Sequence, residues 1–319
     1  MEKVIAVVVT YNRRELLSRC INALRNQSKK VDKILVINNG STDNTQEWLN
    51  AQIDIDFITQ KNVGGAGGFA TGIKTAFERK YSWIWLMDDD GYPKEDALEN
   101  LLADDDEQVC LRNCAVVDIA DKKTFVWKTG IHPTIDLVHE QKVKDVAHPF
   151  NGTLLHRKVI ERVGFPKDNL FLWGDETEYL YRIIKKYKIP CYTKTDSIHY
   201  HPLCTYSYKN DWTYSSNWKM YYYVRNRFFI LKTKFSSSQP VALFMYFAFL
   251  AAFAGTILLY QKTDKFKKLG FILWPMKDAF SNNTEATPPY VLDKLSRSFY
   301  RDFPNYFIQP LKYIRTSLF

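Results

Sequence analysis

The fold is decided by residues 82–90, which read SWIWLMDDD: an apolar run that passes directly into three carboxylates. An uninterrupted apolar run of this length predicts a strand that is buried on both faces. Three short runs of the same kind precede it, and a helical pattern separates each from the next: residues 3–10, 33–38 and 55–59. Such alternation predicts an α/β fold with a mostly parallel sheet and helices on both faces.

Polar clusters follow all four predicted strands. They are Thr10-Tyr11-Asn12, Asn38-Asn39-Gly40, residues 62–68 and Asp88-Asp89-Asp90. In a parallel sheet, ligands bind beyond the carboxyl ends of the strands. We therefore expect the four clusters to lie along one edge and to form one site. Asn12 is also placed to cap the helix that the pattern predicts up to about Asn26.

The three aspartates are candidates for holding a cation. In an extended segment positions i and i+2 point the same way, so Asp88 and Asp90 can face one ion. Carboxylate oxygens suit Mg²⁺ or Mn²⁺, which completes its shell with water and substrate phosphates. The alternative is an acidic turn that caps the helix expected after Pro93.

A glycine-rich stretch, residues 64–68, is predicted to be a turn that leads into a helix over about 68–80. Glycine lets backbone N–H groups approach a phosphate closely, and a helix N-terminus favours anions. Residues 65–70 also fit a dinucleotide fingerprint, with Asp88 about 20 residues further on. A nicotinamide or flavin oxidoreductase is therefore a rival hypothesis, although such sites usually use the first βα turn, which here has no glycine.

Residues 173–179, WGDETEY, place three carboxylates at the start of a helix expected to run from about Glu176 to Lys188. Acidic residues in a first turn are common because of the helix dipole. The functional alternative is a general base, Glu176 or Asp175, which takes a proton from an attacking hydroxyl. His199 and His201 lie at the end of a predicted strand, and one of them is plausible as an imidazole metal ligand.

The last third of the chain has a different character. Residues 201–319 hold 16 Lys and Arg but only 6 Asp and Glu, and residues 241–260 contain no charge. That run is long enough to span a bilayer, but basic residues flank both ends, which favours a segment held at one anionic membrane surface. A buried core helix is the other alternative. Nucleic acid is not an expected partner, because no groove-reading motif occurs.

Five motifs occur in the order found in one known family. They are VVVTYNR (7–13), NNGSTD (38–43), NVGGAGGF (62–69), DDD (88–90) and WGDETEY (173–179). The chain resembles the inverting family 2 glycosyltransferases with the GT-A fold. It is most similar to bacterial galactofuranosyltransferases and rhamnosyltransferases of surface polysaccharides. The resemblance covers residues 1–230, the expected catalytic domain, and leaves 231–319 as a helical region for membrane association.

The resemblance implies a role for each matching position. Asp88 and Asp90 would hold Mn²⁺ or Mg²⁺ on the donor diphosphate, with His199 as third ligand unless His201 takes that place. The nucleotide sugar would be bound by seven further residues: Thr10, Asn12, Asn38, Asn39, Asn62, Gly65 and Asp89. Asn38 stands where the family often has Asp, and Glu176 stands where Asp is common.

The family reaction needs one carboxylate base, because the nucleoside diphosphate departs with the help of the metal. Glu176 or Asp175 would be that base, and Trp173 would bind the acceptor. The expected donor is UDP-galactofuranose, with dTDP-rhamnose as the alternative, and the expected acceptor is a glycan or a polyprenyl-linked glycan. This chemistry implies the cytoplasmic face of the inner membrane, with peripheral or monotopic attachment. A third hypothesis is a non-catalytic membrane-surface protein with a decayed transferase fold.

Overall fold

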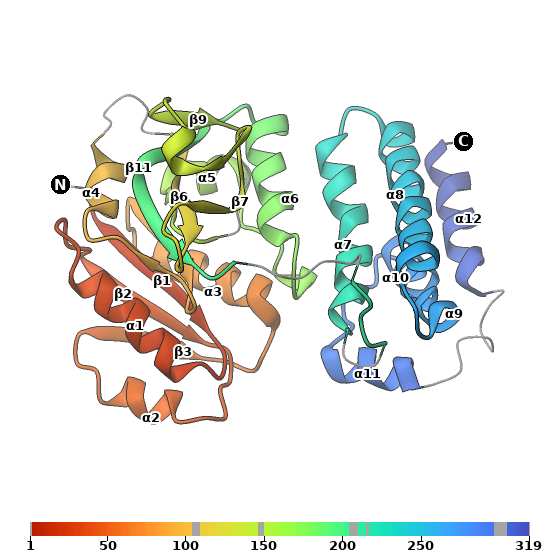
Figure 1. The fold of residues 1–319 in the computed structure, drawn as a ribbon, viewed down its shortest axis with the longest axis horizontal. Coiled ribbons are helices and arrows are strands. Elements are labelled where there is room, and N and C mark those ends of the chain that lie inside the picture. Colours follow the sequence, from red (N-terminus) through yellow and green to blue (C-terminus); the bar gives the residue numbers. More distant parts are fainter. Residues whose placement is uncertain are drawn as a thin grey trace. The chain divides into compact units, whose positions relative to one another are not determined.

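The structure is a computed structural model that describes residues 2–103, 109–145, 150–203, 210–214, 217–296 and 305–318 (Figure 1). The chain divides into two compact units. Unit 1 comprises Met1–Asp168 and Arg182–Cys204, and unit 2 comprises Asn169–Tyr181 and Thr205–Phe319. The predicted boundary after residue 230 separates the chain by function, and it stays a prediction.

The first half of unit 1 is the predicted β-α-β repeat. Its strands β1 (Val4–Thr10), β2 (Lys33–Asn38), β3 (Ile55–Thr59) and β4 (Trp83–Asp88) are all parallel, in the order β3-β2-β1-β4. The register pairs Thr10 with Asn38 and Val9 with Asp88. The polar residues that follow these strands therefore share one edge of the sheet, as predicted.

The second half of unit 1 extends the sheet beyond β4. Strand β10 (Thr153–His156) pairs antiparallel with both β4 and β6 (Leu111–Asp118), and β11 (Cys191–His201) runs parallel to β6. The short β5 (Tyr92–Pro93) then pairs with the end of β11. This last pairing brings the two histidines of β11 next to the segment that follows the aspartates. Three smaller strands complete the set: β7 (Thr124–Thr129), β8 (His132–Thr134) and β9 (Lys142–Lys144).

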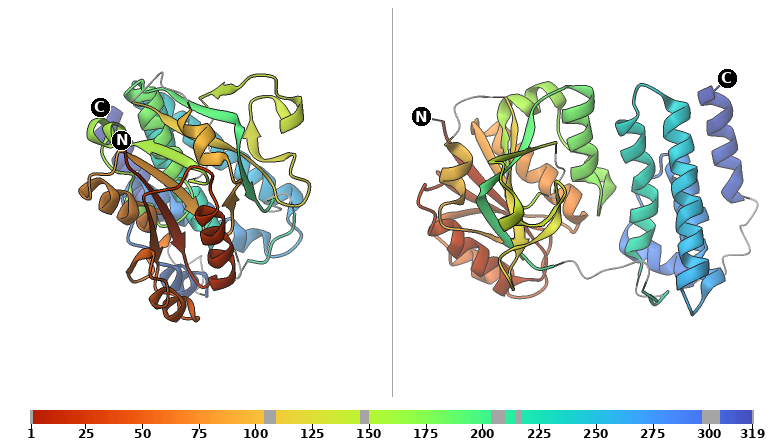
Figure 2. Two further views of the ribbon diagram at one scale, coloured as in Figure 1. Left: turned by 90° about the vertical axis from the view of Figure 1, so that its left-hand side faces the viewer. Right: turned by 45° about the horizontal axis from the view of Figure 1, so that its top comes forward.

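Helices cover both faces of the sheet (Figure 2). Alternate residues of β1 point to opposite faces, so Val4, Ala6 and Val8 share a core with α1 (Arg14–Arg25) and α4 (Ala97–Leu102). Val7 and Val9 instead face α3 (Gly64–Glu78) on the other side. Unit 1 also contains α2 (Thr45–Asn50), α5 (Arg157–Val163) and the 3₁₀ turn Ile135–Leu137. A second 3₁₀ turn, Asp168–Leu170, lies where the chain passes from unit 1 to unit 2.

The glycine stretch differs from its prediction. Helix α3 begins at Gly64, so the glycines lie inside its first turns and do not form a preceding loop. A Cβ at Gly68 would lie 2.6 Å from Val9 Cγ1, and one at Gly72 would lie 2.3 Å from Val7 Cγ1. Gly68 and Gly72 therefore let the helix pack closely on β1. Gly65 is different, because a Cβ there would meet nothing within 4 Å.

The predicted cap of the first helix is also wrong. Asn12 has a left-handed φ of 54° and turns its side chain toward Thr42, whose N–H donates to Asn12 Oδ1 at 2.6 Å. The N–H of Arg14 at the helix start donates instead to Asp43 Oδ2 at 3.3 Å. A carboxylate from the next βα turn thus takes the capping role, since the two turns lie side by side.

Unit 2 is helical. It contains α6 (Asp175–Tyr181), α7 (Lys219–Lys234), α8 (Gln239–Tyr260), α9 (Lys265–Lys268), α10 (Gly270–Phe280), α11 (Pro288–Ser296) and α12 (Asn305–Leu318). Helix α7 packs against α6, α8 and α10. The helix predicted from Glu176 to Lys188 is shorter than expected, since a π-helical turn, Arg182–Lys186, follows α6 and belongs to unit 1.

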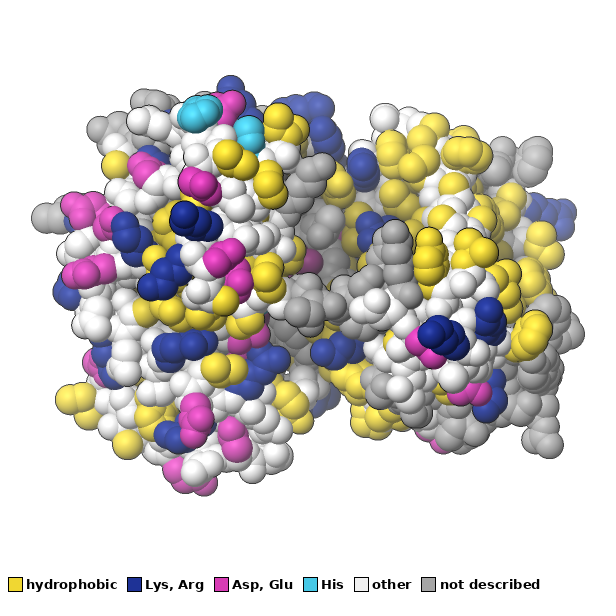
Figure 3. Space-filling view, in the orientation of Figure 1, with side chains coloured by type: hydrophobic (Ala, Val, Ile, Leu, Met, Phe, Trp, Pro, Cys, Tyr) yellow, Lys and Arg dark blue, Asp and Glu magenta, His cyan; other side chains and the backbone are white. Residues whose placement is uncertain are grey.

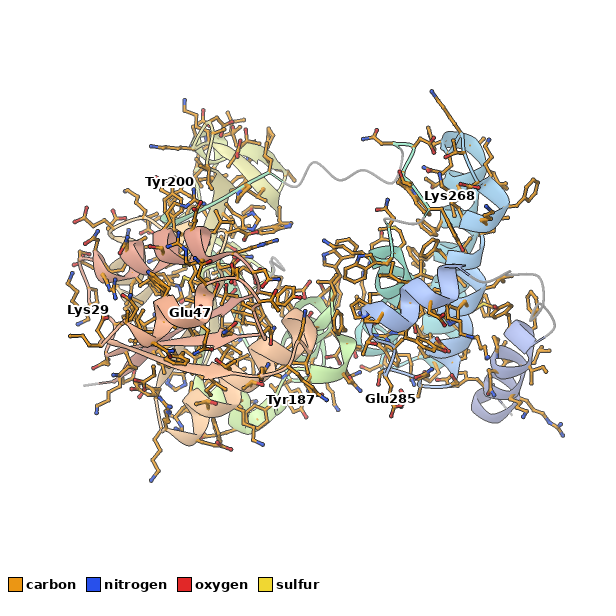
Figure 4. The ribbon with its side chains drawn as sticks, turned by 90° about the horizontal axis from the view of Figure 1, so that it is seen from below. Lys29, Glu47, Tyr187, Tyr200, Lys268 and Glu285 are labelled. Carbon is orange, nitrogen blue, oxygen red and sulfur yellow. The ribbon has the colours of Figure 1, made fainter. Side chains whose placement is uncertain are left out.

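Buried charge pins the loop before α7 to the end of α8. Lys268 is fully buried among the helices of unit 2 (Figure 4), where its Nζ donates to Asp211 Oδ1 at 2.8 Å and to Gln261 Oε1 at 3.0 Å. Its ammonium group also lies 4.8 Å from the centre of the Trp212 ring. A buried charge needs partners of this kind to offset its lost hydration.

Helix α8 has one packed side and one open side. Leu243, Tyr246, Leu250, Phe253 and Ile257 are buried at alternating spacings of three and four residues, as expected for one helix face. The opposite side leaves large apolar side chains exposed, and Figure 3 shows such side chains gathered over unit 2. They include Val241, Phe244, Met245, Leu258 and Leu259. By length and composition Gln239–Tyr260 is also sufficient to cross a membrane, with 33% of its most apolar window buried.

Candidate functional site

The three aspartates lie at the carboxyl end of β4. Asp88 is held by Asn151, which lies two residues before β10. The Asp88 N–H donates to Asn151 Oδ1 at 3.2 Å, and Asn151 Nδ2 donates to Asp88 Oδ2 at 3.2 Å. Arg19 of α1 donates to the backbone carbonyl of Asp90 at 3.1 Å. These bonds fix the backbone and the first carboxylate of the triplet from two different elements.

The end of β1 supplies partners for the other two carboxylates. Thr10 Oγ1 donates to the buried Asp89 Oδ2 at 2.7 Å. Arg13 Nη1 bridges the pair, at 3.2 Å from Asp89 Oδ1 and 2.7 Å from Asp90 Oδ2. Arg13 is not among the site residues predicted from the sequence. The signal available was its place in the motif at residues 7–13, directly after the predicted site residue Asn12.

The two histidines of β11 differ in what they contact. His201 Nε2 lies 3.2 Å from Asp90 Oδ1. His199 is wholly buried, and neither ring nitrogen has a hydrogen-bond partner among the residues that the structure describes. Gly91 lies against that ring, since a Cβ at Gly91 would come within 2.3 Å of His199 Nε2. His201 is thus the imidazole in contact with the aspartates, while the assignment of His199 as a metal ligand stays a prediction.

The electrostatics of this edge are dominated by crowded carboxylates. Burial, together with Asp90 and Asp89, raises the pKa of Asp88 to about 7, and burial raises the pKa of Asp89 to about 6. Burial alone would also raise the pKa of Asp90, but His201 and Arg13 outweigh it and lower the value to about 2. Burial lowers the pKa of His199 to about 3, which keeps its ring neutral. Added positive charge would therefore be favourable at Asp88 and Asp89.

The predicted nucleotide-site asparagines form a second network along the same edge. Asn38 Oδ1 accepts from the Ser41 N–H at 3.0 Å, and Asn39 Nδ2 donates to the Gly64 carbonyl at 3.0 Å. Asn62 Oδ1 accepts from the Gly64 N–H at 2.9 Å. Together with Asn12 these bonds tie the three βα turns of β1, β2 and β3 to one another. Asn39 and Asn62 both act on Gly64, where α3 begins.

The candidate bases lie in unit 2, on α6. Glu176 is half-buried, and its Oε2 accepts from the Gly174 N–H at 3.3 Å. Asp175 is buried. Trp173 precedes them, with its ring 6.4 Å from that of Tyr223 and 5.8 Å from Lys219 Nζ. The structure thus brings the predicted donor-site residues together in unit 1 and the predicted base and acceptor residues together in unit 2.

Within the described part of the chain, no group of three or more His, Cys, Asp and Glu side chains is arranged to hold a metal ion. The carboxylates are instead paired with Arg13, Thr10, Asn151 and His201.

Comparison with known proteins identifies the class. Residues 5–164 match the profile described as Glycosyl transferase family 2, which is half of the chain. The chain belongs to this family and is a glycosyltransferase. The dinucleotide-dependent oxidoreductase that the glycine spacing also allowed is therefore wrong. Of those glycines, Gly68 lets α3 pack closely on β1.

Individual relatives refine this placement. The chain is 30% identical to "Galactofuranosyltransferase GlfT1" of Mycolicibacterium smegmatis over 223 residues, which are 65% of this chain and 74% of that protein. It is 26% identical to "Glycosyltransferase GlyG" of Streptococcus pneumoniae over 218 residues, 54% of this chain and 71% of that one.

Among solved structures, S. aureus TarS 1–349 superposes with a TM-score of 0.57 at 13% identity, covering 95% of this chain and 91% of that one. The same TarS fragment in complex with UDP gives a TM-score of 0.54 at 12% identity, covering 99% of this chain and 81% of that one. The predicted GT-A fold is confirmed.

Proposed function

We propose that this glycosyltransferase moves galactofuranose from UDP-galactofuranose onto a hydroxyl of a lipid-linked or polysaccharide acceptor, with inversion at the anomeric carbon. The observation that carries the proposal is the edge of unit 1 where Thr10, Arg13 and His201 contact Asp89 and Asp90, directly after Asp88. Carboxylates, an arginine and an imidazole at strand ends suit a charged diphosphate and its cation. The similarity to two proteins named galactofuranosyltransferases supports the choice of sugar.

The types of donor group at this edge suit a divalent cation, although the described side chains are not arranged as a complete metal site. Oxygen donors from Asp88 and Asp90 are those that Mg²⁺ or Mn²⁺ prefers. Burial, together with repulsion from Asp90 and Asp89, raises the pKa of Asp88, so a cation there would be favourable. His201 is the better third ligand, since it already contacts Asp90, whereas the His199 ring is enclosed beside Gly91. When bound, the cation would offset the negative charge of the departing diphosphate.

The base has a separate task. Glu176, or Asp175 beside it, takes the proton from the acceptor hydroxyl as that oxygen attacks the anomeric carbon. A bond forms from the acceptor oxygen to this carbon, and the bond from the carbon to the diphosphate oxygen breaks with its electron pair on UDP. Attack from the face opposite the leaving group inverts the configuration. The proposal therefore assigns donor binding to unit 1 and proton removal to unit 2.

The second candidate is a rhamnosyltransferase that uses dTDP-rhamnose, which the motif pattern favours almost equally. A screen of nucleotide sugars with Mn²⁺ present separates the two candidates. Hydrolysis or transfer with UDP-galactofuranose, together with UDP binding that Mn²⁺ strengthens, is the expected result. Turnover of dTDP-rhamnose alone would replace the first candidate with the second. Turnover of neither sugar would contradict both.

The proposed location is the cytoplasmic face of the inner membrane, with attachment through unit 2. The open apolar side of α8 is followed by Lys262, Lys265 and Lys267, whose charge complements anionic lipid. The other side of α8 packs on α7, which carries five Lys and Arg residues. A spanning α8 would take those charges into the bilayer with it, so attachment in the plane of the surface is favoured. A lipid-linked acceptor would be found at the same surface.

A further inference from the structure

The turn that leads into α6 has an unusual backbone. Phe171, Trp173 and Gly174 have φ values of 65°, 59° and 112°, so three of four consecutive residues lie in the left-handed region. Two of them are large aromatic residues, for which this region is unfavourable. Gly174 has a second constraint, since a Cβ there would lie 2.8 Å from Ile230 Cδ1. A backbone of this kind persists only where its surroundings determine it.

One side chain of α7 holds this turn in place. Asn226 is fully buried, and its Nδ2 lies 3.0 Å from the Leu170 carbonyl oxygen, 2.9 Å from that of Leu172 and 2.8 Å from that of Trp173. The turn thus wraps its carbonyl groups around a single amide. Hydrogen bonds between neutral groups are strengthened when both partners are buried, and losing one of them leaves a buried carbonyl group without a donor.

The neighbouring Arg225 reinforces the arrangement. Its Nη2 donates to the same Leu170 carbonyl at 2.9 Å, and its Nε donates to Asn226 Oδ1 at 3.0 Å. The guanidinium group lies 5.3 Å and 5.1 Å from the ring centres of Tyr221 and Tyr222. Asn226 therefore has its acceptor oxygen fixed by Arg225 and its amide group turned toward the turn.

The position of this turn fixes the first residues of α6. The Gly174 N–H donates to Glu176 Oε2 at 3.3 Å, and the Gly174 carbonyl accepts the N–H of Glu178 at 2.8 Å. Both the side chain of Glu176 and the first backbone bond of its helix thus depend on where Gly174 lies. We propose that Asn226, fixed by Arg225, is a positioning residue that sets the orientation of the catalytic base. This inference rests on the proposed role of Glu176 or Asp175.

The test is the Asn226→Asp substitution in the full chain. Aspartate has the same shape and keeps an acceptor for Arg225, but it cannot donate to the three carbonyl groups. We expect kcat to fall about 100-fold, the size of effect that a displacement of a reacting group by about 1 Å produces. The dissociation constant for UDP with Mn²⁺ should stay within about twofold of the wild-type value, because donor binding belongs to unit 1. Hydrogen exchange of the peptide 169–178 should become faster.

The matched control is Thr233→Val, which removes the 2.8 Å hydrogen bond from Thr233 Oγ1 to Glu178 Oε1. It breaks a contact between the same two helices but leaves the turn untouched, so kcat should stay near the wild-type value. Equal losses of kcat in both variants would overturn the inference, because α6–α7 packing in general would then be responsible. An Asn226→Asp protein with wild-type kcat would also overturn it.

A second substitution covers the case in which Asn226→Asp does not fold. Gly174→Ala moves the same turn from its other side, through its positive φ and the contact with Ile230. It should lower kcat with unchanged UDP affinity, and any other result from a folded Gly174→Ala protein overturns the inference. A different result would contradict the proposed function. If Glu176→Gln and Asp175→Asn each transferred sugar at the wild-type rate, neither residue would be the catalytic base.

Discussion

The sheet edge of unit 1 and the turn before α6 in unit 2 both hold reactive side chains, but by different means. At the sheet edge, Thr10 and Asp89 are 79 positions apart and meet because parallel strands end together. At the turn, Asn226 holds backbone carbonyls 53 to 56 positions earlier, through a helix with no regular polar pattern. In a parallel sheet, the order of the strands in the sequence predicts which residues lie close together at their ends. Packing between helices allows no such prediction.

The largest expected effect separates the tasks of the two regions. Glu176→Gln keeps the shape of the side chain but removes the carboxylate proposed as the base, so kcat should fall by about 10²–10⁴-fold. UDP affinity should not change, since the residues proposed to bind the donor lie in unit 1. Steady-state rates and calorimetric titration with UDP and Mn²⁺ check both statements. Glu285→Gln, at an exposed site in the same unit (Figure 4), is the control. A parallel loss of UDP affinity would contradict the division of tasks.

A somewhat smaller effect is expected at the sheet edge. Asp90→Asn should remove the strengthening of UDP binding by Mn²⁺ and slow transfer at least about 100-fold, because a bound cation contributes several kcal/mol to stabilising a departing diphosphate. Titration with UDP, with and without Mn²⁺, measures the first effect directly. Asp96→Asn is the matched control: Asp96 is a half-buried carboxylate of unit 1 directly before α4, and its Oδ2 accepts from Lys94 Nζ at 2.9 Å. Binding that Mn²⁺ still strengthens in Asp90→Asn would argue against a cation there.

Two glycine substitutions, one in each unit, should change the free energy of unfolding in opposite directions. Gly72→Ala places a Cβ 2.3 Å from Val7 Cγ1 in the core of unit 1, and overpacking of this kind destabilises by about 1–3 kcal/mol. Gly255→Ala in α8 meets nothing within 4 Å and should instead stabilise unit 2 by about 0.5–1 kcal/mol. Urea denaturation followed by circular dichroism measures both. Equal effects at the two positions would mean that α3 can move away from β1 without loss.

The smallest expected effect concerns the open side of α8. Leu259 is 78% exposed, and Leu259→Ser should weaken binding to anionic phospholipid vesicles about tenfold, which corresponds to the lower end of about 1.5–3 kcal/mol for one buried leucine. Flotation with vesicles at low and high salt measures the change. Ile53→Ser is the control, because Ile53 is 102% exposed but belongs to unit 1. Vesicle binding that Leu259→Ser leaves unchanged would exclude this side of α8 as the lipid contact.

Much of unit 1 was predictable from the sequence. The four strands, their parallel order and the shared edge of their polar ends follow from apolar runs that each stop at a polar cluster. The use of the glycines was not predictable in the same way, because helix packing and phosphate binding need the same absence of a side chain. Asp90 contacts His201 and not His199 because His199 is buried more deeply in β11. The two histidines lie on one face of the strand, so their spacing in the sequence could not show which of them contacts the aspartates.

Less of unit 2 followed from the sequence. The apolar run of α8 was evident, but its division into a packed and an open side depends on where α7 and α10 lie. Arg225 and Asn226 gave no signal, since a basic, aromatic helix predicts a surface or a membrane contact and not a buried donor to a turn. Their role is fixed only by the tertiary structure.

The path of the chain between the units has a practical consequence for anyone who wishes to express the catalytic half alone. The chain changes units after Asp168, after Tyr181 and again after Cys204, so α6 is encoded well before the rest of its own core. A protein shortened at residue 235 would keep α6 and α7 but lose α8 and α10, and the apolar surface thereby uncovered would favour aggregation. If such a fragment no longer sedimented with membranes, misfolding would explain the result as well as loss of the membrane contact. Single substitutions on the exposed side of α8 test that contact without removing part of the core.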